Sequence, residues 1–156
     1  MKISSPAFHD HESIPSRHTC DGADISPPLT IRDVRADAKS LALIMDDPDV
    51  PPAVRADRNW DHWIVWNLPP TLTGIAEGAT PDGVVGRNSW GRNAYGGPAP
   101  PDREHRYFFK LFALDTRLDL PPTATKPALL EAMKGHMLEE AQLVGRYERI
   151  ALRQPV

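Results

Sequence analysis

The sequence lacks a second cysteine, a long apolar run and an N-terminal signal core. Cys20 stands alone, which excludes an intrachain disulfide. The longest strongly apolar run, Leu41 to Met45, is far shorter than the roughly 20 residues that cross a bilayer. After Met1 and Lys2 the chain turns polar at Ser4 instead of becoming apolar. These absences predict a cytoplasmic protein without a transmembrane segment.

A predominance of one charge is also missing. The chain has 18 basic and 21 acidic residues, a net charge of −3, and no long run of either sign. Nucleic acid and anionic membranes are bound through basic patches, so neither is an expected partner. Phosphate-loop, dinucleotide, zinc-protease and nucleophile-elbow patterns are absent too, which lowers the expectation of an enzyme.

The composition is that of one ordinary globular domain. With 156 residues, 40% hydrophobic and 25% charged, we expect a single domain over residues 1–156. The 17 prolines fall in clusters such as Pro27-Pro28 and Pro98 to Pro101. Proline removes a backbone donor and stops a helix, so the regular elements should be short and the loops stiff.

Three segments have the composition of core strands. Residues 39–45 and 63–68 are short apolar runs, and residues 105–114 place apolar side chains on both faces. A helix is expected from about Thr125 toward Gly135, followed by a helical turn over 137–142 and a final strand over 143–150. Between Gly74 and Asp102 the chain is rich in Gly, Pro, Asn and Asp, and such long loops are usually functional.

Titratable side chains stand at the edges of these strands, in Asp46-Asp47, Asp61-His62 and Glu104-His105. Strand ends can converge in space. Two imidazoles can charge near neutral pH and donate to phosphate oxygens, and a nearby aspartate can raise their pKa. Gly96-Gly97-Pro98 adds backbone amides that can form a concave nest for an oxyanion. The pattern indicates an anion site.

Several blocks together resemble a known family. They are Asp47-Pro48-Asp49-Val50-Pro51, Trp60-Asp61-His62-Trp63, Gly96-Gly97-Pro98 and His105-Arg106-Tyr107. This combination resembles the phosphatidylethanolamine-binding proteins. The blocks Thr19-Cys20-Asp21-Gly22, Gly86-Arg87-Asn88 and Lys134-Gly135-His136 resemble the prokaryotic Raf-kinase-inhibitor-like branch in particular.

The resemblance implies a mainly β fold of antiparallel, Greek-key-like sheets with one or two peripheral helices near the C-terminus. It also implies a pocket for phosphate groups, and the ligand-binding residues would be Asp47, Trp60, His62, Gly97, Pro98, His105 and Tyr107. Asp49 is expected to support the adjoining loop, together with Arg106. A kinase or protease as protein partner and a homodimer are further expectations from the resemblance alone.

Two functional hypotheses follow. The first is a non-catalytic binding protein for a small phosphorylated or otherwise anionic group, such as a phospholipid headgroup, without a cofactor. The alternative is a hydrolase in which Asp47 with His62 or His105 acts as acid and base, and the Gly96-Gly97 amides stabilise an oxyanion. A third class, a module that acts through its surface or as a homo-oligomer, predicts that the two histidines do not affect partner binding.

Asp47 is a difficulty for any anion site. A carboxylate 4 Å from a phosphate would repel it by about 4 kcal/mol at an effective dielectric constant near 20. A protonated His62 or His105, an ammonium group on the ligand, or a protonated phosphate would each relieve this repulsion. Glu104 adds a second acid to the expected rim, and it could weaken phosphate binding or favour a ligand with an amine.

The remaining signals have ordinary explanations. His9 and His11 alternate as strand ligands for a metal would, but no third ligand can be placed, so no metal site is expected. Cys20 has no identifiable histidine partner and is interpreted as structural. Among the tryptophans, Trp60 is the expected pocket wall.

Overall fold

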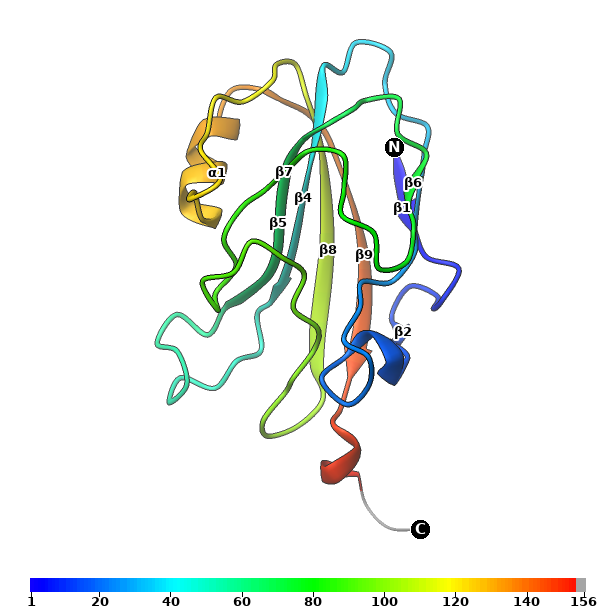
Figure 1. Ribbon diagram of the computed structural model, residues 1–156, viewed down its shortest axis with the longest axis vertical. Helices are drawn as coiled ribbons and strands as arrows, with labels where there is room; N and C mark the ends of the chain where they lie inside the picture. The colour runs from blue at the N-terminus through cyan, green and yellow to red at the C-terminus, as the bar shows by residue number, and fades with distance from the viewer. Residues whose placement is uncertain (154–156) are drawn as a thin grey trace.

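The computed structural model describes residues 1–153, which form two packed sheets (Figure 1). The larger has the strand order β2-β9-β8-β4-β5-β7, and the smaller has the order β1-β3-β6. The strands are β1 (Lys2–Ser4), β2 (Glu12–Ser13), β3 (Leu29–Arg32), β4 (Ser40–Asp47), β5 (Trp60–Leu68), β6 (Gly74–Ile75), β7 (Val84–Val85), β8 (His105–Leu114) and β9 (Met137–Tyr147). Within the described residues every strand pair is antiparallel except β2 with β9, so the expected mainly β, antiparallel fold is confirmed with one parallel pair added.

The three predicted core strands, β4, β5 and β8, lie side by side in the larger sheet. All eight residues of β4 are buried, because the small sheet covers one face of the larger sheet and a helix covers the other (Figure 1). Side chains between the two sheets include Met45, Val65, Phe109 and Leu111, and those beneath the helix include Ile44, Ile64, Trp66, Leu129 and Met133. Burial on both faces explains why these strands read as continuous apolar runs.

The helix, α1 (Lys126–Met133), lies where the sequence predicts it. Thr125 occupies the N-cap position, and Gly135 adopts a positive φ of 77° just beyond the last turn. Leu129 and Met133, four residues apart, are its buried residues. At the first turn, Lys126 pairs with Asp46 (3.1 Å) and so fixes the helix to the sheet. No helix within residues 1–153 is long and apolar enough to span a membrane.

The C-terminal prediction is partly wrong. Residues 137–142 do not form a helical turn, because β9 already begins at Met137 and pairs with β8 over its whole length. Without this pairing, the backbone groups of β8 on that side would lack hydrogen-bond partners. The free-energy cost of leaving them unpaired outweighs the helical preference of Leu138 to Gln142. The end of the expected strand is also different, since Ile150–Leu152 form a short 3-10 helix.

The polar ends of the core strands meet at one end of the larger sheet. β4 ends there at Asp47, β5 begins at Trp60 opposite it, and β8 begins at His105 (Figure 1). The loop 48–59 lies beyond these ends, whereas the loop 86–104 begins beside the middle of β5, where the Gly86 N–H donates to the Ile64 carbonyl, and reaches the bottom of the view only in its last part before β8 (Figure 1). Two long loops and three strand termini therefore surround one small region.

Candidate ligand site at the end of the large sheet

A β-bulge in β5 brings the second histidine into this region. Met45 pairs with Trp63, but Asp46 pairs with Asp61, so His62 is the extra residue of β5. A bulge interrupts the alternation of side chains and can re-aim one of them. The His62 ring accordingly lies edge-on to Tyr107 of β8, with ring centroids 5.2 Å apart. Regular alternation would have placed it on the other face from its neighbour Trp63.

These side chains surround a cavity of about 230 Å³. Its lining residues are Asp47, Val50, Val54, Trp60, His62, Trp90, Ala99, Pro101 and His105. Four of the seven predicted ligand-binding residues are among them, namely Asp47, Trp60, His62 and His105. Tyr107 lies beneath the two histidine rings, while Gly97 and Pro98 do not line the cavity.

His105 is held between two carboxylates. Its Nδ1 lies 2.6 Å from Asp47 Oδ2, and its Nε2 lies 2.6 Å from Asp102 Oδ1. A carboxylate accepts hydrogen bonds, so both ring nitrogens must donate, which requires the imidazolium form. Burial alone would lower the pKa of His105, but the hydrogen bonds and charges of Asp47 and Asp102 outweigh burial and raise that pKa.

His62 has the opposite electrostatic character. Its Nδ1 donates to the carbonyl oxygen of Gly96 at 2.7 Å, so the neutral ring carries its lone pair on Nε2. Burial lowers the pKa of His62, and the Gly96 hydrogen bond and the charge of Asp47 offset this effect only in part. The expectation that both imidazoles charge near neutral pH therefore needs correction: His105 is the charged ring and His62 is the neutral one.

Two buried donors at the site have no partner among residues 1–153. They are the indole Nε1 of Trp60 and the hydroxyl of Tyr107. Burial raises the pKa of the Tyr107 phenol, and the nearby Asp47 carboxylate adds to the effect through its charge and its interaction with the hydroxyl. The hydroxyl therefore stays protonated; it faces Asp47 without the geometry of a normal hydrogen bond and can donate to a better placed acceptor. Leaving a buried polar group unpaired costs about 1–3 kcal/mol, and native proteins leave few such groups. Two of them beside one cavity indicate a place for a hydrogen-bond acceptor.

The predicted amide nest at Gly96-Gly97 is not formed. The Gly96 N–H donates to the His62 carbonyl at 3.0 Å, and the Gly97 N–H donates to Asp24 Oδ1 at 2.8 Å. Neither glycine has a positive φ. The Pro98 carbonyl in turn accepts the N–H of Cys20 at 3.0 Å. Residues 96–98 thus attach the loop 86–104 to residues 18–24 and position the Gly96 carbonyl for His62. The N–H groups of Gly96 and Gly97 are therefore not free to bind an oxyanion.

The residues expected to support the site do hold its loops. Arg106 binds Asp49 through two side-chain hydrogen bonds of 2.8 and 2.9 Å, which tie the loop after β4 to β8. The Asp49 N–H donates to Asp47 Oδ1 at 2.8 Å, so the same loop orients the pocket carboxylate. Glu104 lies 2.9 Å from Arg146 on β9. Of the two acids just before His105 in the chain, Asp102 contacts the His105 ring and Glu104 does not. Asp102 was not among the residues selected from the sequence.

The cavity has an apolar mouth that the sequence did not reveal. Trp90 from the long loop packs against Trp60 and His62, with ring centroids 5.3 and 5.0 Å apart. Trp90 and Val54 remain 39% and 55% exposed at the rim. The sequence contained one signal for this role of Trp90, namely its position in a loop rich in Gly and Asn. Such a loop has few apolar residues against which a tryptophan side chain could be buried.

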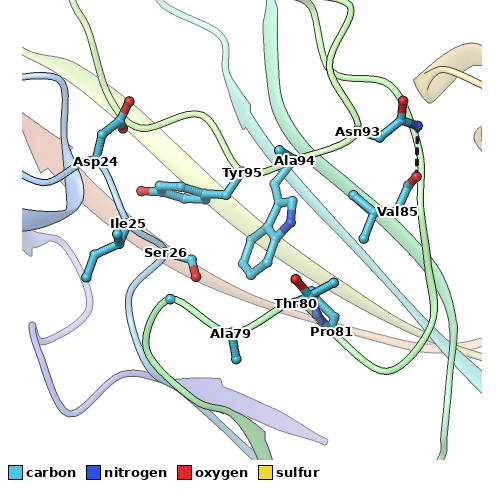
Figure 2. Close-up of a pocket in the computed structure, with 12 residues that line it drawn as sticks. Asp24, Ile25, Ser26, Ala79, Thr80, Pro81, Val85, Asn93, Ala94 and Tyr95 are labelled. Carbon is cyan, nitrogen blue, oxygen red and sulfur yellow. Dashed lines mark hydrogen bonds between the residues drawn. The ribbon is translucent and has the colours of Figure 1, made fainter.

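A second cavity, of about 220 Å³, lies near the other side of residues 93–97 (Figure 2). Tyr95 and Asp24 line it together with the loop 78–81, and at one side of it Asn93 donates to the Val85 carbonyl at 3.0 Å. None of the predicted ligand-binding residues contributes to this cavity. Asp24, which lines this second cavity, accepts the Gly97 N–H.

The structure therefore has two packed β-sheets, a peripheral helix, and a cavity at the strand ends that combines apolar walls with the polar side chains of Asp47, His62 and His105. A family model described as phosphatidylethanolamine-binding protein matches residues 4–148. The chain belongs to the phosphatidylethanolamine-binding protein family, as the sequence motifs predict.

Relatives of known sequence span almost the same length. A UPF0098 protein from Chlamydia pneumoniae is 52% identical over 149 residues, covering 96% of this chain and 99% of the relative. A UPF0098 protein from Methanothermobacter thermautotrophicus is 53% identical over 155 residues, with the same coverage.

Solved structures show the same fold. The crystal structure of a putative phosphatidylethanolamine-binding protein homolog from Chlamydia trachomatis is 49% identical with a TM-score of 0.93, covering 95% of this chain and 97% of that one. Escherichia coli YbcL, described as a member of the mammalian family, is 29% identical with a TM-score of 0.85, covering 95% of this chain and 98% of that one.

Proposed function

We propose that this protein is a non-catalytic binding protein whose cavity takes a small anionic group, such as the phosphate of a phospholipid headgroup or of a modified partner. The observation that carries the proposal is the pair of unpartnered donors, Trp60 Nε1 and Tyr107 Oη, beside the charged ring of His105. A phosphate oxygen is an acceptor that would satisfy such donors.

The charge on His105 relieves the difficulty raised by Asp47 only in part, because Asp102 places a second carboxylate on the same ring. The imidazolium lies 2.6 Å from the Asp47 carboxylate and compensates its charge inside the sheet. An anionic acceptor would gain more from this charge than a neutral acceptor would. His62 adds an Nε2 that accepts a proton from a protonated phosphate oxygen or becomes a donor when the ring is protonated.

The alternative of a hydrolase has less support. Its oxyanion donors were to be the N–H groups of Gly96 and Gly97, and both already donate within the protein. A charged His105 cannot take a proton from water, so of the two histidines only His62 could serve as a base beside Asp47. The involvement of a kinase or protease as partner, and of a homodimer, remain predictions from the resemblance.

Calorimetric titration of phosphate and phosphoethanolamine at pH 6 tests the proposal, with product analysis of the same samples. The wild type should bind without forming product. Tyr107→Phe should bind about tenfold or more weakly, because a hydrogen bond to a charged group contributes about 1.5–3 kcal/mol. Without ligand, the free energy of unfolding of this variant should stay the same or rise, since the substitution removes a buried hydroxyl that has no hydrogen-bond partner within residues 1–153.

Tyr147→Phe is the matched control. The Tyr147 hydroxyl donates to Asp21 at 2.7 Å, so this variant should lose stability and keep the affinity of the wild type. Accumulation of hydrolysed product would support the hydrolase instead. Absence of binding in the wild type, or equal affinity of wild type and Tyr107→Phe, would contradict the proposed use of the cavity.

A further inference from the structure

The outward-facing N–H of His105 is already occupied by a carboxylate of the same chain. Asp102 Oδ1 lies 2.6 Å from Nε2, three residues before the histidine, at the end of the loop 86–104. Its neighbour Pro101 lines the cavity, so the contact lies at the cavity wall. The position that a ligand oxygen would take on the charged ring is therefore filled by an oxygen of Asp102.

The two carboxylates on His105 differ in how firmly they are held. The Asp47 side chain is 4% exposed and also accepts the Asp49 N–H, whereas the Asp102 side chain is 40% exposed. Asp102 Oδ2 lies 3.8 Å from Arg103 Nε, so a charged partner stands beside Asp102 if it leaves the histidine. Asp47 is a fixed part of the sheet, and Asp102 is the partner that can be exchanged.

The charges of Asp47, His105 and Asp102 show why an anion would bind only after Asp102 has left the ring. Asp47 and Asp102 contribute two negative charges and His105 one positive charge, which leaves the trio net negative. A phosphate that approaches this trio is repelled as long as Asp102 stays in place. Once Asp102 turns toward solvent, the remaining Asp47–His105 pair is neutral and the Nε2–H is available.

We propose that Asp102 is a specificity-determining residue that competes with small anions for the Nε2–H of His105 and so sets how strongly the cavity binds them. This inference rests on the proposed binding of an anion in the cavity. It identifies the acid that controls affinity as Asp102 rather than Glu104, whose carboxylate is engaged by Arg146 at 2.9 Å.

A purely supporting role for Asp102 makes the opposite prediction. If Asp102 served only to keep His105 oriented and charged, its removal would weaken anion binding. If it competes, its removal strengthens binding. Asp102→Asn separates the two, because asparagine keeps an acceptor oxygen for Nε2–H and loses only the charge. The groups facing the His105 ring, Asp47 and Tyr107, are unchanged in this variant.

The experiment is calorimetric titration of phosphate and of sulfate at pH 5.5 into the wild type, Asp102→Asn and Glu104→Gln. Asp102→Asn should bind both anions more tightly, by up to about fivefold, since a partly exposed charge contact is worth up to about 1 kcal/mol. Glu104→Gln removes the same charge two residues away and should change affinity much less. If anion affinity rose equally in Asp102→Asn and Glu104→Gln, the rise would be explained by the change in net charge alone, and the proposal would be overturned.

Titration of His105 by NMR tests the contact without a ligand. Loss of the Asp102 charge should lower the pKa of His105, while Glu104→Gln should leave it near the wild-type value. If the pKa does not change in Asp102→Asn, the contact is absent in solution and this inference fails whatever the ligand does. If the wild type binds phosphate and Asp102→Asn binds equally or less tightly, only this inference fails. If the contact is present but no variant binds phosphate or sulfate, the proposed function fails and this inference with it.

Discussion

His105 and Asp47 form a charged pair inside the large sheet, with Nδ1 and Oδ2 separated by 2.6 Å and both side chains almost completely buried. They come from β8 and β4, which are adjacent strands, and each is the terminal residue of its strand. Neither charge is exposed to bulk solvent in this position. Each therefore depends on the other, and the pair links the chemistry of the cavity to the stability of the sheet.

Removing one member of this pair should destabilise the protein strongly. His105→Ala leaves the Asp47 charge buried without its partner, which should lower the free energy of unfolding by about 3–5 kcal/mol. In the double variant with Asp47→Ala that uncompensated charge is gone. The two losses should then sum to more than the loss in the double variant, by about 0.5–3 kcal/mol.

Urea unfolding at pH 6 of the wild type, His105→Ala, Asp47→Ala and the double variant measures this coupling free energy as a double-mutant cycle. Strict additivity of the two single substitutions would mean that the pair is not coupled in solution. Lys134→Ala provides a baseline for charge removal at an exposed pair, because Lys134 contacts Glu131 with both side chains more than 70% exposed. Exposed pairs of this kind contribute at most about 1 kcal/mol.

Much of this arrangement could be predicted from the sequence. β4, β5 and β8 are apolar runs bounded by proline or polar residues, and their burial on both faces follows from composition. The choice of Asp47, Trp60, His62 and His105 as pocket residues came from strand edges and family motifs, and these four do line one cavity. Local patterns were sufficient here because each residue sits next to a recognisable strand end.

The features that escaped prediction all depend on pairing between distant segments. The bulge that turns His62 toward Tyr107 follows from the register of β5 against β4, which no local pattern reports. Asp102 lies in a loop, and its contact with His105 depends on the path of residues 98–104. The Gly96-Gly97 amides looked free in sequence because their partners, His62 and Asp24, bond to them only in the folded chain.

The opposite pKa shifts of the two histidines predict how anion affinity depends on pH. Protonation of His62 adds a donor at Nε2, so affinity should fall as pH rises through the lowered pKa of His62, below 6.5. His105, with its raised pKa, stays charged past that point, so a second fall is expected above 6.5. Wild type should therefore show two steps rather than one.

Sulfate is the suitable probe, because phosphate esters themselves titrate near pH 6. Calorimetry over a range that extends well below and well above pH 6.5 should give both steps in wild type and only the upper step in His62→Asn. Asparagine can still donate to the Gly96 carbonyl, as Nδ1 of His62 does at 2.7 Å, so the fold should be retained. A flat wild-type profile between pH 5.5 and 8 would exclude the histidines as the source of the affinity.

Substitution by alanine should reduce the stability of the protein by different amounts at Gly96 and Gly97, because a side chain at each position would meet different atoms. A Cβ at Gly97 would collide with the His18 carbonyl and with the Asp24 carboxylate that accepts the Gly97 N–H. Backbone cannot yield easily, so Gly97→Ala should lower the free energy of unfolding by about 1–3 kcal/mol. A Cβ at Gly96 would meet the Trp90 ring, which is partly exposed and can move aside.

Gly96→Ala should consequently cost less stability than Gly97→Ala and change phosphate affinity more, since Trp90 is a wall of the cavity. Urea unfolding and calorimetry on both variants check the two rankings. If the Gly97 amide bound the anion directly, as the motif alone suggests, Gly97→Ala would instead weaken phosphate binding beyond its effect on folding. Because that N–H is held by Asp24 at 2.8 Å, we expect the affinity of the folded Gly97→Ala protein to stay close to that of the wild type.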